Sequence, residues 1–341
     1  MRVAFDAQLT VGTATGIGTY QRELAAALTA AGLDIVMLAN AGLDPWRFDR
    51  RVLWDQIMLP AQTARSGAAL LHATAGTLPL LRTMPAVVTI HDLAWLRVQQ
   101  HTRSYARAYF GALQRRLARG ADAIIADSAF TAAEIAELIA PRAPVHVVHL
   151  GVGEERARAA RTPRHIAPFA LVTGTVERRK NLGAIVEALP QLPRLRVVSI
   201  GPLTPYARDV ARRAAELGVD DRLELRGYVE PAERARLEAE ATLALVPSRY
   251  EGFGYALADA LVGGIPVIAA RSSSLVEVAG GDAVLVDPDD TAGWTHAIAA
   301  LLADPGAAEQ RAAALRVRSA ARFAWPLCAQ ATRAVYASVA S

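Results

Sequence analysis

The sequence predicts an α/β protein built from two doubly wound domains, each with a parallel β-sheet covered by helices. Its length of 341 residues suits two domains that each bury a core. Short apolar runs rich in β-branched residues alternate with helical stretches, which is typical of buried parallel strands and their crossover helices. The segment 153–168 carries charge and proline without periodicity, which indicates an exposed connection between the domains.

The apolar runs fall into two series. We expect the strands of the first domain at residues 3–7, 34–39, 69–73, 86–92, 121–128 and 144–150. We expect those of the second domain at residues 169–176, 196–201, 223–227, 241–248, 266–270 and 283–288. After the last strand the pattern becomes helical. Pro326 is expected to start or kink a final helix, because proline lacks the amide hydrogen that a helix interior uses.

Composition restricts the class of protein. A hydrophobic content of 52% with 21% charged residues is typical of a chain that folds throughout. Cys328 is the only cysteine, so no internal disulfide can form. Asp6 stands where a secretory signal needs its apolar run, and no stretch approaches about eighteen uninterrupted apolar residues. We therefore expect a cytoplasmic protein and leave open a location at the inner face of the membrane.

The charge pattern argues against nucleic-acid binding. The formal net charge is +4, but the arginines are scattered and no aromatic-rich basic module is present. One group of arginines at helical spacing, interleaved with aromatic residues, could form an acceptor-side or membrane-surface face, although an ordinary solvated helix is favoured. These residues are Arg103, Arg107, Arg115 and Arg119, with Tyr105, Tyr109 and Phe110 between them.

Two glycines follow the first predicted strand at the opening of a helix. Gly16 and Gly18 could let backbone amides approach a phosphate at the helix N-terminus, where the helix dipole also favours an anion. The segment lacks the complete GxGxxG spacing and the ribose-binding acid of a dinucleotide site. Tight-turn packing is the favoured interpretation of these glycines taken alone.

His91 ends a predicted strand, which is where open α/β sheets present groups to ligands. Its ring could hydrogen-bond a sugar hydroxyl or stabilise a developing leaving-group charge. A histidine pinned to loop carbonyls is an equally good interpretation. His72, at an earlier strand end, is expected to be structural or peripheral to a site.

A basic turn opens the second domain. Arg179 and Lys180 would place cationic donors where a diphosphate meets a helix N-terminus, and Asn181 is the expected N-cap of that helix. A solvated basic turn is the usual alternative, but Lys180 is the only lysine in the chain, which suggests that a compact point charge is needed there. Further along, the backbone at 227–229 could bind the flat edge of a base.

The stretch EGFGYALAD, from Glu251 to Asp259, is the strongest functional signal. It follows a predicted strand, Gly252 and Gly254 relax the backbone, and a helix is expected over about 255–262. The amides of this loop would face an anion, Glu251 could meet sugar hydroxyls, and Asp259 could accept a hydrogen bond from a ribose diol. The alternatives are a capping acid and an exposed helical acid.

Taken in order, these segments resemble the retaining glycosyltransferases of family four, which have two facing Rossmann-like domains (the GT-B fold), and especially the mannosyltransferase-B-like branch of that family. The resemblance spans nearly the whole chain and is highly specific as an ordered set. Its segments are TGIGTYQREL, VVTIHDLAWL, IIADSAFTAAEI, GTVERRKNL, RGYVEPAERARL, PSRYEGFGYALADAL, GGIPVIAARSSSLVEVAGGDAVLVDP and FAWPLCAQATRAVY.

The resemblance implies a cleft between the two domains and a C-terminal helix that crosses back to the first. An acceptor-side domain would comprise residues 1–158 with 323–341, and a domain that binds the nucleotide-sugar donor would comprise 159–322. Gly16 and Gly18 would approach the donor phosphates, and His91 would lie near the transferred sugar.

In the second domain the resemblance implies that Arg179 and Lys180 neutralise the leaving diphosphate. Glu251 matches the first acid of the E-x7-E pattern, which contacts the donor sugar. The second acid, which binds the ribose, falls on Asp259, where the family pattern expects glutamate. The implied donor-binding set also includes Gly227, Tyr228, Val229, Gly252, Phe253, Gly254 and Tyr255.

The implied activity is retaining transfer of a hexosyl unit, with a GDP-sugar such as GDP-mannose as the favoured donor, to a hydroxyl of a glycan, a lipid-linked acceptor or a small molecule. No metal and no further cofactor are expected, since the basic pair would stabilise the leaving group. Two alternatives stay open: a nucleotide-sugar 2-epimerase on the same architecture, and a catalytically silent partner that binds sugar nucleotides.

Overall fold

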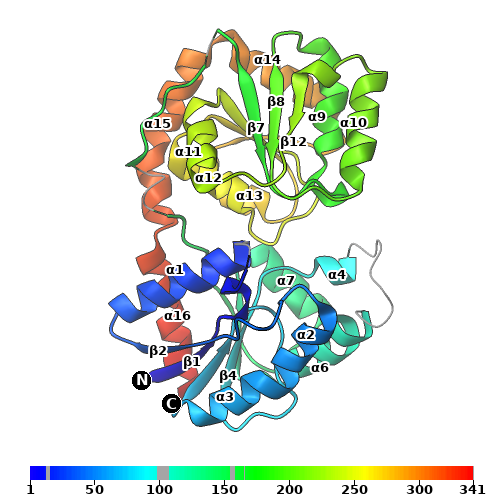
Figure 1. Ribbon diagram of the computed structural model, residues 1–341. Coiled ribbons are helices and arrows are strands. Elements are labelled where there is room, and N and C mark those ends of the chain that lie inside the picture. Colours follow the sequence, from blue (N-terminus) through cyan, green and yellow to red (C-terminus); the bar gives the residue numbers. More distant parts are fainter. Residues whose placement is uncertain (13–15, 98–106, 154–157, 165, 341) are drawn as a thin grey trace. The chain divides into compact units, whose positions relative to one another are not determined.

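The computed structural model describes residues 1–12, 16–97, 107–153, 158–164 and 166–340. Contacts divide the chain into two compact units, residues 1–151 with 323–341 and residues 152–322. In the described residues each unit holds a six-stranded parallel sheet with helices packed against it (Figure 1). The α/β class and the two doubly wound sheets expected from the sequence are therefore confirmed.

The first sheet has the strand order β2-β1-β3-β4-β5-β6, and all neighbours run parallel. Its strands are β1 (Arg2–Asp6), β2 (Asp34–Leu38), β3 (Leu70–Ala73), β4 (Ala86–Ile90), β5 (Ala123–Ala126) and β6 (Val145–Val147). The α-helices described around it are α1 (Gly16–Ala30), α2 (Phe48–Leu53), α3 (Leu59–Arg65), α4 (Ala94–Arg97), α6 (Arg115–Ala118) and α7 (Ala129–Leu138). A 3₁₀ turn, η1 (Gln8–Thr10), and two π-helical segments, η2 (Trp54–Met58) and η3 (Arg107–Gln114), complete this unit.

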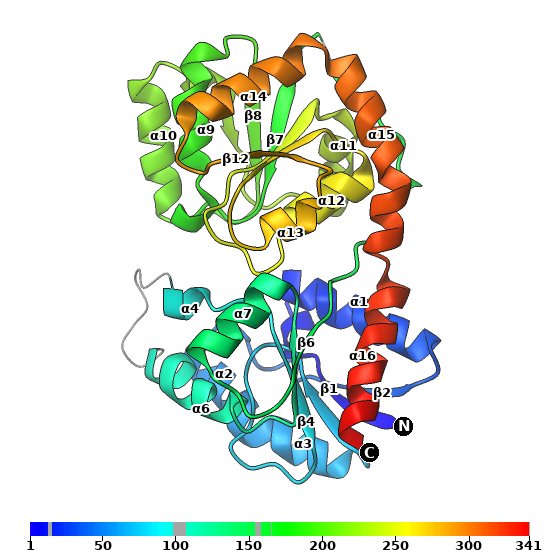
Figure 2. The same ribbon diagram turned by 180° about the vertical axis from the view of Figure 1, so that it is seen from behind.

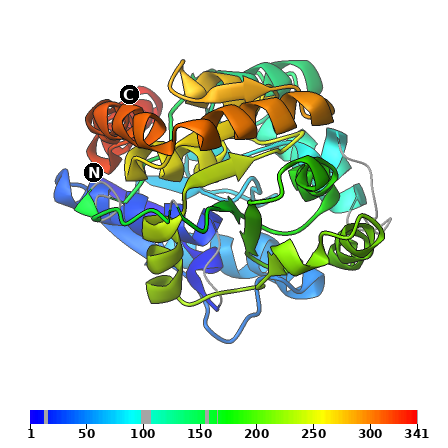
Figure 3. The ribbon, with the colours of Figure 1, turned by 90° about the horizontal axis from the view of Figure 1, so that it is seen from above.

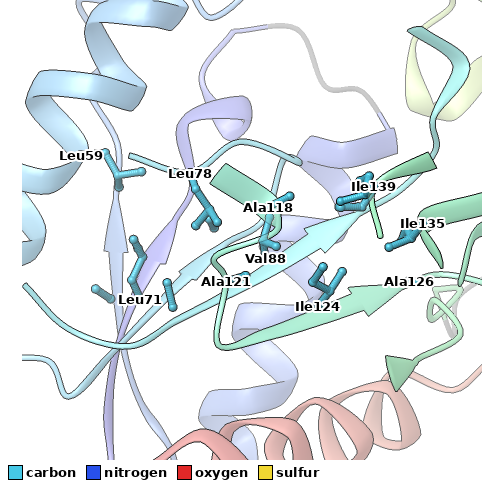
Figure 4. Packing of buried hydrophobic residues seen from close by; sticks show 14 of the residues in the cluster. Leu59, Leu71, Leu78, Val88, Ala118, Ala121, Ile124, Ala126, Ile135 and Ile139 are labelled. Carbon is cyan, nitrogen blue, oxygen red and sulfur yellow. The ribbon is translucent and has the colours of Figure 1, made fainter. Parts of the chain in front are cut away.

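One face of the first sheet carries a continuous apolar core. Leu71, Val88 and Ile124 of neighbouring strands belong to it, because side chains alternate between the two faces along a strand (Figure 4). Leu59 of α3 and Ile135 of α7 pack into the same cluster. Full burial of a side chain of this size stabilises a fold by about 1.5–3 kcal/mol.

The C-terminal helix α16 (Trp325–Ala340) packs within the first unit. It contacts α1, β4 and β5, and Figure 2 shows it beside α1. Pro326 is its second residue, a position where the missing amide hydrogen costs nothing. The return of the chain's last helix to the first unit agrees with what the resemblance implied.

A buried hydrogen-bond chain joins α1, the first sheet and α16. The Tyr20 hydroxyl lies 2.9 Å from Thr89 Oγ1, and Thr89 Oγ1 lies 2.7 Å from His72 Nε2. The other ring nitrogen of His72, Nδ1, lies 2.6 Å from the Tyr336 hydroxyl. Burial, assisted by the nearby His91, lowers the pKa of His72 to about 3. His72 is therefore a neutral structural residue, in line with the expectation from the sequence.

The second sheet has the strand order β12-β11-β10-β7-β8-β9, again parallel throughout. Its strands are β7 (Phe169–Thr173), β8 (Arg196–Ile200), β9 (Leu223–Leu225), β10 (Leu243–Val246), β11 (Val267–Ala270) and β12 (Val284–Val286). On one face lie α9 (Leu182–Ala188), α10 (Tyr206–Glu216) and α14 (Thr291–Ala303). On the other lie α11 (Pro231–Glu240), α12 (Tyr255–Gly263), α13 (Leu275–Ala279) and α15 (Pro305–Arg322). Three short turns complete this unit: η4 (Arg178–Lys180), η5 (Leu189–Gln191) and η6 (Asp220–Arg222).

The chain bends between α14 and α15 at Asp304. Figures 2 and 3 show that α14 and α15, both part of the second unit, run in different directions. The Asp304 carboxylate accepts from the Ala307 amide at 3.0 Å, which satisfies one of the open amides at the start of α15.

The described part of the expected connection, 158–164, is held to the second unit. The Arg161 guanidinium donates to Glu309 at 2.8 Å and to the carbonyls of Glu238 and Ala241 at 2.6 and 2.8 Å. Only 9% of its side chain is exposed, so these bonds are made in a largely desolvated setting where an unpaired guanidinium would be costly. This stretch is therefore a structural part of the second unit.

No helix in the described ranges is long and apolar enough to cross a bilayer. Of the proposed arginine-aromatic face, Arg103 and Tyr105 lie outside the described residues. Tyr109 is buried, and its hydroxyl donates to Asp55 at 2.8 Å. Arg119 donates to the Ile139 carbonyl, so these two residues belong to the packing of the first unit.

Candidate functional site

A buried carboxylate and two cations form the centre of the candidate site. Lys180 Nζ donates to Glu251 Oε1 at 2.6 Å, and Arg179 Nη1 donates to Glu251 Oε2 at 3.3 Å. Only 8% of the Glu251 side chain is exposed, against 20% for Lys180 and 22% for Arg179. We call these three residues the ion trio. The sequence predicted each of them separately, and the fold brings them together within the second unit.

Electrostatics keep Glu251 of the ion trio ionised. Burial alone would raise the pKa of Glu251, but the charges of Lys180 and Arg179 and the hydrogen bond from Lys180 outweigh it and lower that pKa below its usual range. Arg179 Nε also pairs with Glu177 at 2.8 Å, so two carboxylates face the two cations and hold them in place. An anionic ligand that reaches this point would meet two cationic donors that are already oriented.

The backbone around the basic turn explains how Lys180 and Arg179 are aimed. Asn181, between η4 and α9, adopts the left-handed conformation with φ of 56°. Its amide group donates to the carbonyls of Pro247 and Pro288 at 3.2 and 2.8 Å, and its oxygen accepts from Arg249. The Asn181 side chain therefore makes no capping bond to α9, in contrast to the expected N-cap, because it fastens the turn to the loops that follow β10 and β12.

The loop that carries Glu251 is fixed by serines and glycine. Ser273 Oγ accepts from the Glu251 amide, and Ser274 Oγ donates to its carbonyl, both at 2.9 Å. Gly254, just before α12, has φ of 93°, and a Cβ there would lie 2.5 Å from Leu275 Cδ2. Glycine is required at this position for both reasons. The loop is thus a rigid support for the carboxylate.

The remaining predicted residues of this loop are largely buried. Phe253 and Tyr255 pack edge to face with ring centroids 5.8 Å apart. Gly252 and Phe253 are buried, and Tyr255 is partly exposed at the start of α12. The helix begins at Tyr255, as the sequence predicted.

Asp259 lies within α12 and is paired with a residue that sequence reasoning missed. Arg234 of α11 donates to Asp259 Oδ2 at 2.6 Å and to Glu238 at 2.7 Å. Asp259 is buried, so the interpretation as an exposed helical acid is wrong. The only sequence signal for Arg234 was its place on the helix that follows the 227–229 loop.

The 227–229 loop has three different environments. Gly227 has φ of 67°, and its carbonyl accepts from the Gly201 amide at 2.8 Å. Tyr228 is 53% exposed, whereas Val229 packs against the core cluster that contains Phe169. Of these three, Tyr228 has the side chain most available to a ligand.

A small pocket opens at the carboxyl edge of the second sheet. Its walls include Gly174 and Lys180, and Ser199 and Ser248 also line it. Ligands of open α/β folds bind at this edge, since the strand-to-helix loops converge there. The pocket lies next to the ion trio, with Lys180 common to both.

In the first unit, His91 follows β4 and is held between two oxygen acceptors. Its Nδ1 lies 2.6 Å from Asp127 Oδ2, and its Nε2 lies 2.8 Å from the Thr74 carbonyl. The Tyr20 ring packs edge-on against it at 4.8 Å between centroids. The interpretation of a histidine pinned to a loop carbonyl therefore holds for Nε2. Asp127 was missed as a partner, although it too follows a strand, β5.

Gly16 and Gly18 lie in the first turn of α1, and Gly18 is buried. Residues 13–15 of the same motif lie outside the described part of the chain. Within the described ranges, no group of three or more His, Cys, Asp and Glu side chains is arranged to hold a metal ion.

Comparison with known proteins identifies the family. A family model described as Glycosyltransferase Family 4 matches residues 14–156, and one described as Glycosyl transferases group 1 matches residues 167–304. Glycogen synthase from Mycobacterium tuberculosis is 30% identical over 94% of this chain and 90% of its own length. The chain belongs to glycosyltransferase family 4. It is a retaining glycosyltransferase that transfers a hexosyl unit from a nucleotide-sugar donor.

Further relatives are described as enzymes that act on different sugars. The MMP α-(1→4)-mannosyltransferase of Mycolicibacterium hassiacum is 28% identical over 79% of this chain and 68% of its own. The O-antigen chain mannosyltransferase B of Escherichia coli is 31% identical over 49% of this chain and 45% of its own. Sucrose-phosphate synthase from Thermosynechococcus elongatus, a solved structure, matches with a TM-score of 0.78 at 22% identity, over 99% of this chain and 98% of its own. That likeness supports the GT-B fold with two Rossmann-like domains.

Proposed function

We propose that this glycosyltransferase moves a mannosyl or closely related unit from a GDP-sugar to a hydroxyl of a glycan, a lipid-linked acceptor or a small molecule. Two relatives described as mannosyltransferases support the choice of sugar, while the relative described as a glycogen synthase makes a glucosyl donor the main competitor. The donor diphosphate binds at the ion trio. The observation that carries this placement is the pairing of buried Glu251 with Lys180 and Arg179.

The ion trio suits departure of a nucleoside diphosphate. As the bond to the anomeric carbon breaks, negative charge grows on the phosphate oxygens, and Lys180 and Arg179 are already oriented by Glu251 to stabilise it. The N-terminal end of α12 adds a favourable dipole. Glu251 accepts from hydroxyls of the transferred sugar, so it serves both the substrate and the cations.

Retention of configuration follows from attack on the same face that the leaving group vacates. The acceptor oxygen forms a bond to the anomeric carbon as the bond from that carbon to the phosphate oxygen breaks. The acceptor's proton passes to the departing phosphate oxygen, so no protein base and no covalent sugar intermediate are required. Cations close to the phosphate lower the barrier to this step more than they stabilise the bound donor.

The nucleoside is held by the second unit. Asp259 receives the ribose diol, and the backbone of Gly227, Tyr228 and Val229 meets the base. In the first unit, the start of α1 at Gly16 and Gly18 contributes to phosphate binding, and His91 lies near the transferred sugar. The first unit accordingly provides the acceptor side of the reaction.

The test is a thermal-shift series with GDP-, UDP-, dTDP- and ADP-sugars, because a ligand that binds only the native state raises the melting temperature. We expect GDP-mannose to give the largest shift and to support transfer of labelled mannose to an acceptor. A reaction without acceptor is the control for donor hydrolysis or epimerisation. Stabilisation by a UDP- or ADP-sugar with none by GDP-mannose would contradict the proposed donor.

A further inference from the structure

His91 is held in one orientation by a buried partner outside the predicted catalytic set. Asp127 is 1% exposed and directly follows β5, the strand beside β4. Its Oδ2 lies 2.6 Å from His91 Nδ1, while the Thr74 carbonyl lies 2.8 Å from Nε2 on the opposite side of the ring. Both distances are those of good hydrogen bonds. The ring therefore has an oxygen acceptor at each nitrogen.

This geometry determines where protons reside. A carbonyl oxygen can only accept, so Nε2 must carry a hydrogen. An ionised carboxylate can also only accept, so a second proton lies between Nδ1 and Asp127 Oδ2. A neutral imidazole facing an ionised Asp127 could satisfy only one of the two acceptors. The pair consequently retains a proton that an isolated histidine would lose near neutral pH.

We infer that Asp127 is a positioning residue of the transfer reaction, which keeps His91 protonated at both nitrogens and fixes the plane of its ring. This inference rests on the proposed place of His91 beside the transferred sugar. In this state neither ring nitrogen has a lone pair, so His91 cannot remove the acceptor's proton. It acts as a fixed cationic ring, and the departing phosphate oxygen is left as the proton's destination.

The surroundings of the pair favour this state. Burial lowers the pKa of His91, and the charge of Asp92, the next residue in the chain, opposes that fall. Asp127, through its charge and its hydrogen bond, turns the balance so that the pKa of His91 lies above its usual range. The Tyr20 ring from α1 faces His91 edge-on, and His72 on β3 stays neutral.

Two more titratable groups lie near Asp127. Burial raises the pKa of Asp127, although the charges of His91 and of His149, after β6, oppose that rise, and Cys328 of α16 interacts with Asp127 electrostatically. Burial raises the pKa of the Cys328 thiol to about 12, so that group is neutral at physiological pH. The charges that decide the state of His91 are therefore those of Asp127 and Asp92.

The experiment compares Asp127→Asn with the wild type and with Asp122→Asn. Asp122 directly precedes β5, is 45% exposed and accepts from the Ala86 amide, so the control changes a carboxylate at the opposite end of the same strand. In the Asp127→Asn variant the pKa of His91 falls, because a neutral amide no longer favours the imidazolium. We expect kcat at neutral pH to drop about 10-fold or more, the donor KM to change less than about two-fold, and the alkaline limb of the kcat profile to move down by about one pH unit or more.

An Asp127→Asn enzyme with the wild-type pH profile would overturn the inference, as would equal losses of kcat and kcat/KM at every pH without a shift of the limb. A double-mutant cycle adds a second readout, since Asp127→Asn should have little further effect in a His91→Gln background.

If Asp127→Asn does not fold, nitrogen NMR of the wild-type His91 ring decides the question. Two protonated nitrogens at neutral pH support the inference, and one unprotonated nitrogen contradicts it. This measurement needs no donor, so the inference can fail while the donor assignment stands, and the reverse is equally distinguishable.

Discussion

At the scale of single residues, the ion trio shows how one lysine acquires a specific role in a chain that otherwise uses arginine. Lys180 presents a compact charge at 2.6 Å from Glu251, while Arg179 reaches the same carboxylate at 3.3 Å and the Tyr250 carbonyl at 3.1 Å. Arg179 is thus held by the loop backbone as well, whereas the orientation of the Lys180 side chain depends more on Glu251. Lys180 is therefore the better probe of phosphate binding.

Replacement of Lys180 by alanine should reduce donor kcat/KM by about 10²-fold or more, because a cation aimed at the leaving group is lost. Arg178→Ala is the matched control from the same turn, since Arg178 is 58% exposed, pairs with Asp209 and stacks over Tyr206. Steady-state kinetics with the donor found by thermal shift would measure both. Unchanged donor affinity and turnover in Lys180→Ala would show that the phosphate does not bind at the ion trio.

His72 should make the stability of the protein fall at acidic pH. Its pKa is lowered to about 3 by burial, so between about pH 6.5 and pH 3 the unfolded chain binds a proton that the native ring does not. Stability is unaffected above this window and falls as pH drops through it. Denaturant unfolding of wild type and His72→Gln measures this effect. Between about pH 6.5 and pH 5 we expect the free energy of unfolding of the wild type to fall by about 2 kcal/mol more than that of the variant.

If the free energy of unfolding changed with pH to the same extent in wild type and His72→Gln, the native His72 ring would have to accept a proton at mildly acid pH. Glutamine keeps a donor and an acceptor for Thr89 and Tyr336, so the comparison isolates the titration from loss of the hydrogen-bond chain.

At the scale of elements, α12 connects the ion trio to the nucleoside-binding region, and its start depends on Gly254. Alanine there would have to adopt φ of 93° and would place Cβ 2.5 Å from Leu275 Cδ2. Gly254→Ala should cost roughly 1–3 kcal/mol of repacking beyond the backbone strain. Gly218→Ala is the control, because Gly218 has φ of 64° with no atom within 4 Å of an added Cβ.

Denaturant unfolding of the two glycine variants measures this difference. We expect Gly218→Ala to lose about 1 kcal/mol from strain alone and to retain activity. Gly254→Ala should lose more stability and should also lose activity with the donor, since Glu251 sits on the same loop. Equal losses in the two variants would show that Leu275 yields at little cost.

The elements themselves were predictable from the sequence, while several side-chain partners were not. Buried parallel strands need continuous apolar runs, so each observed strand overlaps an expected one. Pairings such as Arg234 with Asp259, or Asp127 with His91, join segments 25 and 36 residues apart and depend on register between elements. Asn181 illustrates the limit: its position before α9 was predicted, but its side chain binds Pro247 and Pro288 because those loops end beside it.

At the scale of the whole molecule, the first unit is completed by the last helix of the chain. Gly151 lies against the Trp325 ring, where an added Cβ would come within 2.2 Å, and Tyr336 hydrogen-bonds His72. Cys328, Val335 and Tyr336 are buried along α16. The first unit therefore combines strands from the start of the chain with a covering helix from its end. It can complete its fold only after residues 152–322, which form the second unit, have been synthesised.

The single cysteine gives a direct measure of whether α16 stays attached. Burial raises the pKa of the Cys328 thiol to about 12, and the thiol is 3% exposed, so labelling by a thiol reagent should be on the order of 10³-fold slower than in the unfolded chain from thiolate depletion alone. We expect the labelling rate to rise in step with global unfolding as denaturant is added. Tyr336→Phe, which removes one buried hydrogen bond from α16, should accelerate labelling modestly, by about 5-fold for a bond worth about 1 kcal/mol. Fast labelling of the wild type under native conditions, with the circular dichroism of both units retained, would instead mean that α16 separates from the first sheet on its own, because Cys328 can react only when the helix that carries it has left α1, β4 and β5.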